Sequence, residues 1–153
     1  MEDKALLSTE EASGAEKAEL LIVIPAYNEA ENIERVVNHL TANFPQYDYV
    51  VVNDGSRDET AAICQRNGYN LLNLPVNLGL AGAFQAGLKY ADKYGYQYAV
   101  QLDGDGQHRP EYLESMIKKM EEGYDIVIGS RFVGEKKPFT MRMLGSNLIE
   151  MAI

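Results

Sequence analysis

Short apolar runs without alternating polar residues recur along this 153-residue chain, and amphipathic helical patterns separate them. A run that is apolar on both faces needs cover on both faces, so such runs predict strands of a parallel sheet packed between helices. Alternating strands and helices favour right-handed crossovers, and we therefore expect an α/β fold with a mostly parallel central sheet flanked by helices. The predicted strands are residues 20–25, 49–53, 71–74, 98–102 and 125–128.

Two segments between the predicted strands have apolar residues at helical spacing. Each predicts an amphipathic helix with one buried stripe. Pro110, just before the second pattern, suits the first position of a helix. Segments 28–31 and 56–59 are similar to capping boxes, which predicts helix starts there. The apolar positions are Ile33, Val36, Val37 and Leu40 in the first segment, and Leu113, Met116, Ile117 and Met120 in the second.

A cluster of polar or turn-forming residues follows each of the five predicted strands. Open α/β sheets bind ligands beyond the carboxyl ends of their strands, so we expect these clusters to converge on one site. One cluster alone is ordinary turn chemistry, whereas five in succession favour a binding site. The clusters are Pro-Ala-Tyr-Asn-Glu at 25–29, Asn-Asp-Gly-Ser at 53–56, Asn-Leu-Gly at 77–79, Asp-Gly-Asp-Gly-Gln at 103–107 and Gly-Ser-Arg at 129–131.

The acidic cluster after the fourth predicted strand carries the clearest chemical signal. Asp103 and Asp105 are two residues apart, so at strand spacing both carboxylates point to one side, and Gly104 leaves room for a ligand. Two close carboxylates repel each other unless a cation lies between them. Mg²⁺ or Mn²⁺ binds one or two carboxylates together with phosphate oxygens, and Gln107 can add a neutral oxygen. We therefore predict a metal site at Asp103, Asp105 and Gln107 that receives a diphosphate.

Other ligand-binding loops fit the sequence poorly. A calcium EF-hand starting at Asp103 would need glycine where His108 stands, and a helix rather than a strand would precede it. The chain has no P-loop signature, and no predicted strand is followed by the glycine pattern of dinucleotide-binding folds. These absences argue against kinase, P-loop and dehydrogenase functions.

The charge balance bears on the class of ligand. Lys and Arg total 14 and Asp and Glu total 23, which gives a net charge of −9. Binding along a nucleic-acid backbone needs a basic face, so we expect no nucleic-acid partner. A metal ion can still supply local positive charge for a small polyphosphate.

The first 19 residues differ in composition from the rest. They carry six acidic residues and two lysines without a continuous apolar stretch, which predicts a disordered acidic tail before a domain at 20–153. No segment approaches the roughly 20 apolar residues that cross a bilayer, and the tail lacks a signal-peptide pattern. Cys64 is the only cysteine, which suits a reducing compartment. We expect a cytoplasmic location.

Taken in order, the five clusters resemble the motifs of family 2 glycosyltransferases. The resemblance is strongest to the branch that includes dolichyl-phosphate mannose synthase and bacterial polyprenyl-phosphate glycosyltransferases. It runs from about residue 20 to about residue 153 and identifies the family but not the sugar. It rests on residues 22–29, 53–56, 77–79 with Gly82 and Ala83, 102–108 and 129–131.

This resemblance implies a GT-A fold and an inverting transfer from a UDP- or GDP-linked sugar. Pro25, Tyr27 and Glu29 would hold the nucleoside, and Asp54 would accept a hydrogen bond from the base. Asn77 and Gly79, in the third motif, are expected to belong to the same nucleotide site.

The resemblance also assigns the catalytic part of the site. Asp103 and Asp105 would form the family's Asp-x-Asp motif, with Gly104 between them and with Asp105 and Gln107 nearest the metal. Arg131 would face the diphosphate. A metal and an arginine at that place would stabilise the charge that develops on the leaving group.

The implied acceptor is a polyprenyl phosphate or a growing cell-surface glycan, and a lipid acceptor would bring the protein to the cytoplasmic face of a membrane. Family catalytic domains usually continue past Ile153, and residues 142–151 form a helical pattern without a stop signal. We therefore expect an incomplete catalytic domain that binds a nucleotide or nucleotide sugar but transfers sugar poorly or not at all. The apolar residues of 143–149 would favour self-association.

Two alternatives stay open from the sequence. A sugar-nucleotide nucleotidyltransferase would want a glycine-rich basic loop after the first strand, and residues 25–29 are not such a loop. A non-catalytic nucleotide-binding module is compatible with the short chain.

Overall fold

The computed structural model describes residues 19–104 and 110–129. Residues 1–18 of the predicted tail, the predicted helix at 142–151, and the site candidates Asp105, Gln107 and Arg131 lie outside these described residues. The chain divides into two units, residues 1–111 and residues 112–153. Each unit is described by itself.

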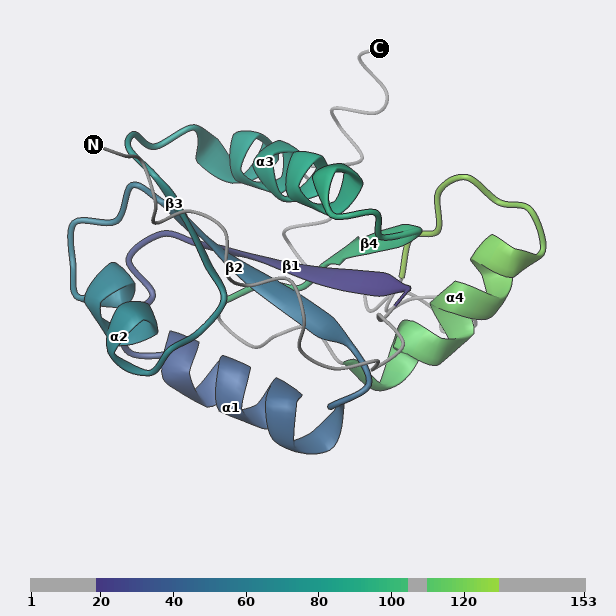
Figure 1. The fold of residues 1–153 in the computed structure, drawn as a ribbon, viewed down its shortest axis with the longest axis horizontal. Helices are drawn as coiled ribbons and strands as arrows, with labels where there is room; N and C mark the ends of the chain where they lie inside the picture. The colour runs from purple at the N-terminus through teal and green to yellow at the C-terminus, as the bar shows by residue number, and fades with distance from the viewer. Residues whose placement is uncertain (1–18, 105–109, 130–153) are drawn as a thin grey trace, which may run out of the picture. The chain divides into compact units, whose positions relative to one another are not determined.

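The first unit holds a four-stranded parallel sheet between helices, as the sequence predicts. The strand order is β3-β2-β1-β4, and every neighbouring pair is parallel. Figure 1 shows α3 on one face of the sheet and α1 and α2 on the other. The elements are β1 (Leu20–Ala26), α1 (Ile33–Asn43), β2 (Asp48–Asp54), α2 (Thr60–Arg66), β3 (Leu71–Leu74), α3 (Gly79–Lys93) and β4 (Tyr98–Gln101).

Strand β1 lies inside the sheet, between β2 and β4, and all seven of its residues are buried. Val23, for example, pairs with Val50 of β2 and with Gln101 of β4. Successive side chains of a strand point to opposite faces, so an all-apolar strand serves two cores at once. The continuous apolar run of β1 is therefore explained by helices on both faces.

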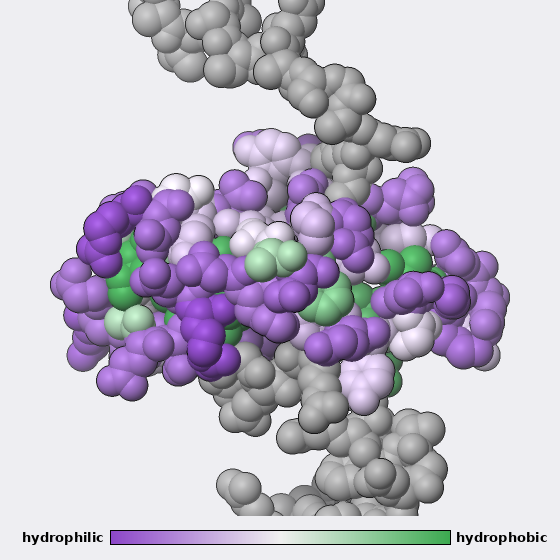
Figure 2. All heavy atoms as spheres, turned by 90° about the horizontal axis from the view of Figure 1, so that it is seen from below, coloured by the Kyte–Doolittle hydropathy of each residue, from purple (hydrophilic) through white to green (hydrophobic). Residues whose placement is uncertain are grey.

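The core beneath α3 comes from alternate strand residues. Small side chains of α3 pack there against β1 and β2, with half-buried residues such as Phe84 around them. On the other face, α1 buries Ile33, Val37 and Leu40, while Val36 is only half-buried. The surface seen from that side in Figure 2 is mostly hydrophilic, as expected of amphipathic helices over a sheet. The buried cluster beneath α3 is Leu21, Val23, Val50, Val52, Ala83 and Ala91.

The second unit contributes α4 (Leu113–Glu121), which follows a short 3₁₀ turn, η1 (Pro110–Tyr112). The predicted start at Pro110 is confirmed by that turn. The predicted strand at 125–128 is wrong, because the structure has no strand there. Ile126 is 78% exposed and Ile128 is 84% exposed. An apolar run forms a strand only where a neighbouring strand and a cover are present, and the described residues provide neither for this run.

The two predicted capping boxes are also not formed. Helix α1 begins at Ile33 and α2 at Thr60, later than predicted, and neither has a side-chain cap. Instead, the two segments bond to each other: Asn28 bonds to Ser56 and Arg57, and the N–H of Ala30 donates to Asp58. Among the described helices, none is long and apolar enough to cross a bilayer.

Helix α3 lies unusually close to β1. A Cβ atom built on Gly87 would come 2.2 Å from Cγ1 and 2.8 Å from Cγ2 of Val23. Ala83, Gly87 and Ala91 are spaced four residues apart and are all buried, so small residues line the sheet-facing side of the helix. This close approach fixes where the start of α3 lies over the sheet.

Replacing Gly87 with alanine should therefore destabilise the domain by about 1–3 kcal/mol, because the added methyl group overpacks the contact with Val23. Glycine to alanine inside a helix otherwise stabilises by roughly 0.5–1 kcal/mol, so the sign of the change in unfolding free energy distinguishes the two effects. Urea unfolding followed by circular dichroism measures the change. Lys89→Ala, at an exposed position of α3, is the control and should stay within about 0.5 kcal/mol of wild type. A Gly87→Ala protein as stable as wild type would contradict the close packing.

Candidate functional site

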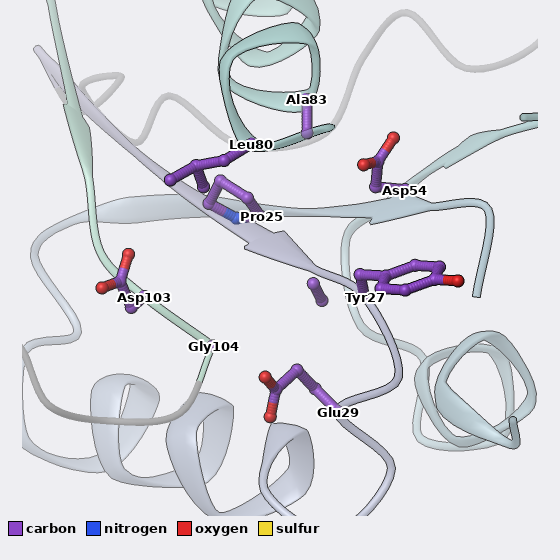
Figure 3. A pocket seen from close by; sticks show the side chains of 9 residues that line it. Pro25, Tyr27, Glu29, Asp54, Leu80, Ala83, Asp103 and Gly104 are labelled. Carbon is purple, nitrogen blue, oxygen red and sulfur yellow. The ribbon is translucent and has the colours of Figure 1, made fainter. Parts of the chain in front are cut away.

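An open pocket of about 240 Å³ lies at the carboxyl end of the sheet in the first unit. Segments far apart in sequence meet there, since its wall is formed by the ends of β1 and β2, the loops after β1 and β4, and the start of α3 (Figure 3). The residues that line it are Pro25, Ala26, Tyr27, Glu29, Asp54, Leu80, Ala83, Asp103 and Gly104.

Six of the predicted site residues are brought together in this pocket. They come from the carboxyl ends of β1 and β2 and from the loops after β1 and β4, as expected if the polar clusters share one edge of the sheet. What each of them binds stays a prediction. The six are Pro25, Tyr27, Glu29, Asp54, Asp103 and Gly104.

Asn77 and Gly79, also predicted to bind the nucleotide, are absent from the pocket wall. Asn77 Oδ1 accepts a hydrogen bond from the Gly79 N–H at 3.1 Å, which closes the turn that starts α3. Gly79 has φ +74°, a backbone conformation that favours glycine. Both residues thus shape the entry to α3.

Leu80 lines the pocket but was missed from the sequence, whereas Ala26 and Ala83, which also line it, were named only as members of motifs without a role of their own. Leu80 and Ala83 are three residues apart and so share one face of α3. The spacing could have placed Leu80 in the site, but only if it were known from the fold that this face of α3 meets the ends of the strands. Leu80 is still 59% exposed, which gives the pocket an apolar rim.

Asp54 is almost completely buried at the end of β2, with 3% of its surface exposed. Its Oδ1 accepts a hydrogen bond from the Leu78 N–H at 2.7 Å. Among the described residues, Oδ2 has no hydrogen-bond partner. The carboxylate therefore fixes the segment before α3 with one oxygen and keeps its second oxygen for the pocket.

Gly55 reinforces this contact between the end of β2 and the segment before α3. It has φ +66°, and a Cβ atom there would lie 2.7 Å from the backbone nitrogen of Asn77. Only glycine allows both the conformation and the approach.

The opposite wall of the pocket is formed by the loop after β4. Gln101 Nε2 donates a hydrogen bond to Asp103 Oδ1 at 3.1 Å, which orients that carboxylate. Gly104 is buried, and a Cβ atom there would lie 3.1 Å from the carbonyl oxygen of Pro25. The acidic loop therefore packs directly against the end of β1.

The charges around the pocket have one sign. Glu29, Asp54 and Asp103 line it, and the described lining residues include no lysine, arginine or histidine. Carboxylate oxygens are the ligands that hard divalent cations prefer, and Mg²⁺ typically takes only one or two from the protein. No group of three His, Cys, Asp or Glu side chains in the described part of the chain could hold a metal by itself. The donor set thus fits a cation that is shared with a ligand.

The loop after β1, which carries Tyr27 and Glu29, is tied to the start of α2. The N–H of Glu29 donates to Thr60 Oγ1 at 2.9 Å, and the N–H of Ala30 donates to Asp58 Oδ2 at 3.1 Å. Asn28 has φ +57°, a left-handed conformation that non-glycine residues rarely adopt. We call residues 56–60 the α2 clamp, because they hold this loop through hydrogen bonds between side chains and backbone.

Asp58 accepts several hydrogen bonds within the α2 clamp. Burial alone would raise its pKa, but bonds from the hydroxyl and N–H of Thr60 and from the N–H of Ala30 outweigh it and lower the pKa. Asp58 is therefore ionised at neutral pH. The stability that the ionised Asp58 carboxylate adds to the fold is lost only as the pH falls through that lowered pKa.

Comparison with known proteins assigns the chain to a family. The family model described as "Glycosyl transferase family 2" matches residues 21–151. The polyprenol monophosphomannose synthase of Mycolicibacterium smegmatis is 34% identical over 119 residues, which cover 74% of this chain and 45% of that protein. The undecaprenyl-phosphate mannosyltransferase of Micrococcus luteus is also 34% identical over 119 residues, covering 74% of this chain and 49% of that protein. This chain spans about half the length of the curated relatives that it matches.

Solved structures show the same fold. TarS 1-349 of S. aureus, in complex with UDP-GlcNAc, matches 80% of this chain and 37% of its own with 26% identity and a TM-score of 0.53. The mannosyltransferase PcManGT of Pyrobaculum calidifontis, in complex with GDP-Man and Mn²⁺, matches 68% of this chain and 32% of its own with 21% identity and a TM-score of 0.54. The predicted GT-A fold is confirmed.

The resemblance noted in the sequence is thus supported by most of the chain, by curated relatives in the polyprenyl-phosphate branch and by the fold. The chain belongs to glycosyl transferase family 2.

Proposed function

We propose that this chain supplies the donor site of an inverting glycosyltransferase that takes its sugar from a nucleoside diphosphate. The observation that carries this proposal is a pocket whose charged lining residues, among those described, are all carboxylates. Such a pocket repels a bare diphosphate but accepts one that arrives with a divalent cation.

The nucleoside is proposed to lie between Tyr27 and Leu80, with its base edge at Asp54. Figure 3 has Tyr27 and Asp54 on one side of the pocket and Asp103 on the other. The unpartnered Oδ2 of Asp54 can accept the ring N–H that both uracil and guanine carry. UDP- and GDP-linked sugars are therefore both proposed donors, and the structural neighbour TarS binds UDP-GlcNAc.

The diphosphate is proposed to lie at the Asp103 side of the pocket. Asp103, with Asp105 and Gln107 of the same loop, would hold Mg²⁺ or Mn²⁺, which offsets the charge that develops on the leaving diphosphate. Arg131 is proposed to add a second positive charge there. Gly104 keeps this loop against the end of β1, so Asp103 is fixed relative to the nucleoside wall.

A polyprenyl phosphate is the proposed acceptor, in line with the name of the mycobacterial relative. One of its phosphate oxygens would attack the anomeric carbon opposite the leaving group, forming a carbon–oxygen bond while the bond to the diphosphate breaks. The configuration inverts, and the nucleoside diphosphate leaves. Because this phosphate is already ionised at neutral pH, the attack needs no strong general base. A glycan hydroxyl, the other proposed acceptor, would need one.

Replacing Asp54 with asparagine tests the nucleoside assignment. Asparagine can still accept from the Leu78 N–H, but it presents an NH₂ donor where a base would donate. The affinity for the preferred nucleoside diphosphate should fall about 10- to 100-fold, the effect of losing a charged hydrogen-bond partner. Isothermal titration calorimetry with UDP and GDP in excess Mn²⁺ measures it. Unchanged affinity in a folded variant would exclude Asp54 as the reader of the base.

Replacing Asp103 with asparagine tests the catalytic assignment. Transfer of radiolabelled sugar from UDP- and GDP-sugars to polyprenyl phosphate is measured with Mn²⁺ present. Any transfer by the wild-type chain should fall at least about tenfold in Asp103→Asn, because the carboxylate beside the diphosphate loses its charge. Asp92→Asn removes the same charge at an exposed position of α3 and should transfer as wild type does.

Two results would contradict this proposal. Equal transfer by Asp103→Asn and Asp92→Asn would remove the acidic loop from the reaction. Wild-type protein that binds neither UDP nor GDP in Mn²⁺ would remove the donor site, whereas tight nucleotide binding without transfer agrees with a chain that supplies the donor site alone.

A further inference from the structure

Thr60 is completely buried at the start of α2, although it does not line the pocket. Its hydroxyl donates to Asp58 Oδ1 and accepts the N–H of Glu29. A hydroxyl has one hydrogen to donate, and the Asp58 carboxylate takes it. The lone pairs of Thr60 Oγ1 are therefore free to accept the N–H of Glu29. Asp58 thus makes the Thr60 hydroxyl an acceptor toward Glu29.

Glu29 is also held by its carboxylate. Asn32 Nδ2 donates to Glu29 Oε2 at 3.0 Å, and Arg35 donates to Asn32 Oδ1 at 3.3 Å. Thr60 fixes the backbone of Glu29 and Asn32 fixes its side chain. Figure 3 shows the Glu29 carboxylate at the pocket, so both contacts determine where this negative charge lies.

Asn28, between Tyr27 and Glu29, is the one non-glycine residue in the described part of the chain with a positive φ. Such a conformation persists only where its surroundings hold it. Its N–H donates to Ser56 Oγ at 3.0 Å, and its Oδ1 accepts the N–H of Arg57 at 2.9 Å. The α2 clamp therefore holds the turn between two pocket residues from both sides.

We infer that Thr60, oriented by Asp58, is a positioning residue for the nucleotide. The α2 clamp presets the loop from Tyr27 to Glu29 in its binding conformation before a ligand arrives. A loop that is already ordered loses less conformational freedom on binding, so the clamp raises affinity without touching the ligand. This inference rests on the proposed nucleotide site.

The test compares a substitution that keeps the shape of the side chain but not its hydroxyl with one that keeps the hydroxyl and loses only a methyl group. Thr60→Val removes the hydroxyl and should weaken binding of the nucleoside diphosphate preferred by wild type about tenfold, the effect of one lost hydrogen bond. Thr60→Ser keeps the hydroxyl and should stay within about threefold of wild type. Calorimetry in excess Mn²⁺ gives the affinities. Hydrogen exchange at the Glu29 amide, which should be faster in Thr60→Val, reports the clamp itself.

Thr41→Val is the matched control. It also removes a threonine hydroxyl, one that bonds to the Val37 carbonyl within α1. It should leave both the nucleotide affinity and the Glu29 amide exchange as in wild type. If Thr60→Val fails to fold, Asp58→Ala decides instead, because Asp58 is exposed and its loss removes the group that orients Thr60.

The outcomes separate this inference from the proposed function. Wild-type protein that binds no nucleoside diphosphate would overturn the proposed function and the inference resting on it. Wild-type binding with equal affinity in the folded Thr60→Val variant, or in Asp58→Ala where that variant replaces it, would overturn the inference alone. Weakened binding in Thr60→Val with rescue in Thr60→Ser would support it.

Discussion

The parallel pairing of β1 with both β2 and β4 is the constraint on which the rest of the first unit depends. It sends three strands in one direction, so the segments that follow them meet at one edge. Strand β1 can be wholly apolar because helices cover both of its faces. On one face, helix α3 packs very close to β1, because Gly87 has no side chain to separate it from Val23. The start of α3 is thereby held at the same edge as the strand ends.

The pocket at that edge gathers negative charge, which is unfavourable unless something offsets it. Glu29, Asp54 and Asp103 are each oriented by a hydrogen bond from a neighbouring side chain or backbone group. These hydrogen bonds keep the three carboxylates from moving apart, and the proposed divalent cation with its diphosphate would offset their negative charge. The α2 clamp contributes to this arrangement of charge, because its hydrogen bonds to Glu29 and Ala30 hold the loop that carries the Glu29 carboxylate.

Sequence patterns predicted the part of this fold that depends on local periodicity and failed where a distant partner decides. The run at 71–74 forms the predicted strand because β2 lies beside it, whereas the equally apolar run at 125–128 has no partner among the described residues. Residues 56–59 looked like a helix cap, yet they bond to the loop after β1, a contact that local sequence cannot reveal. Leu80 was missed for the same reason, since only the packing of α3 brings it to the pocket.

Calorimetric titration of UDP and GDP into the wild-type chain, with Mn²⁺ and then with EDTA, tests the central claim most directly. Because the described charged residues of the pocket are all carboxylates, we expect one nucleoside diphosphate to bind with Mn²⁺ and its affinity to fall at least about tenfold once the metal is chelated. The corresponding nucleoside, which lacks phosphates, should be insensitive to the metal. Equal diphosphate affinity in Mn²⁺ and in EDTA would contradict the account, because the pocket would then bind an anion against its own charge.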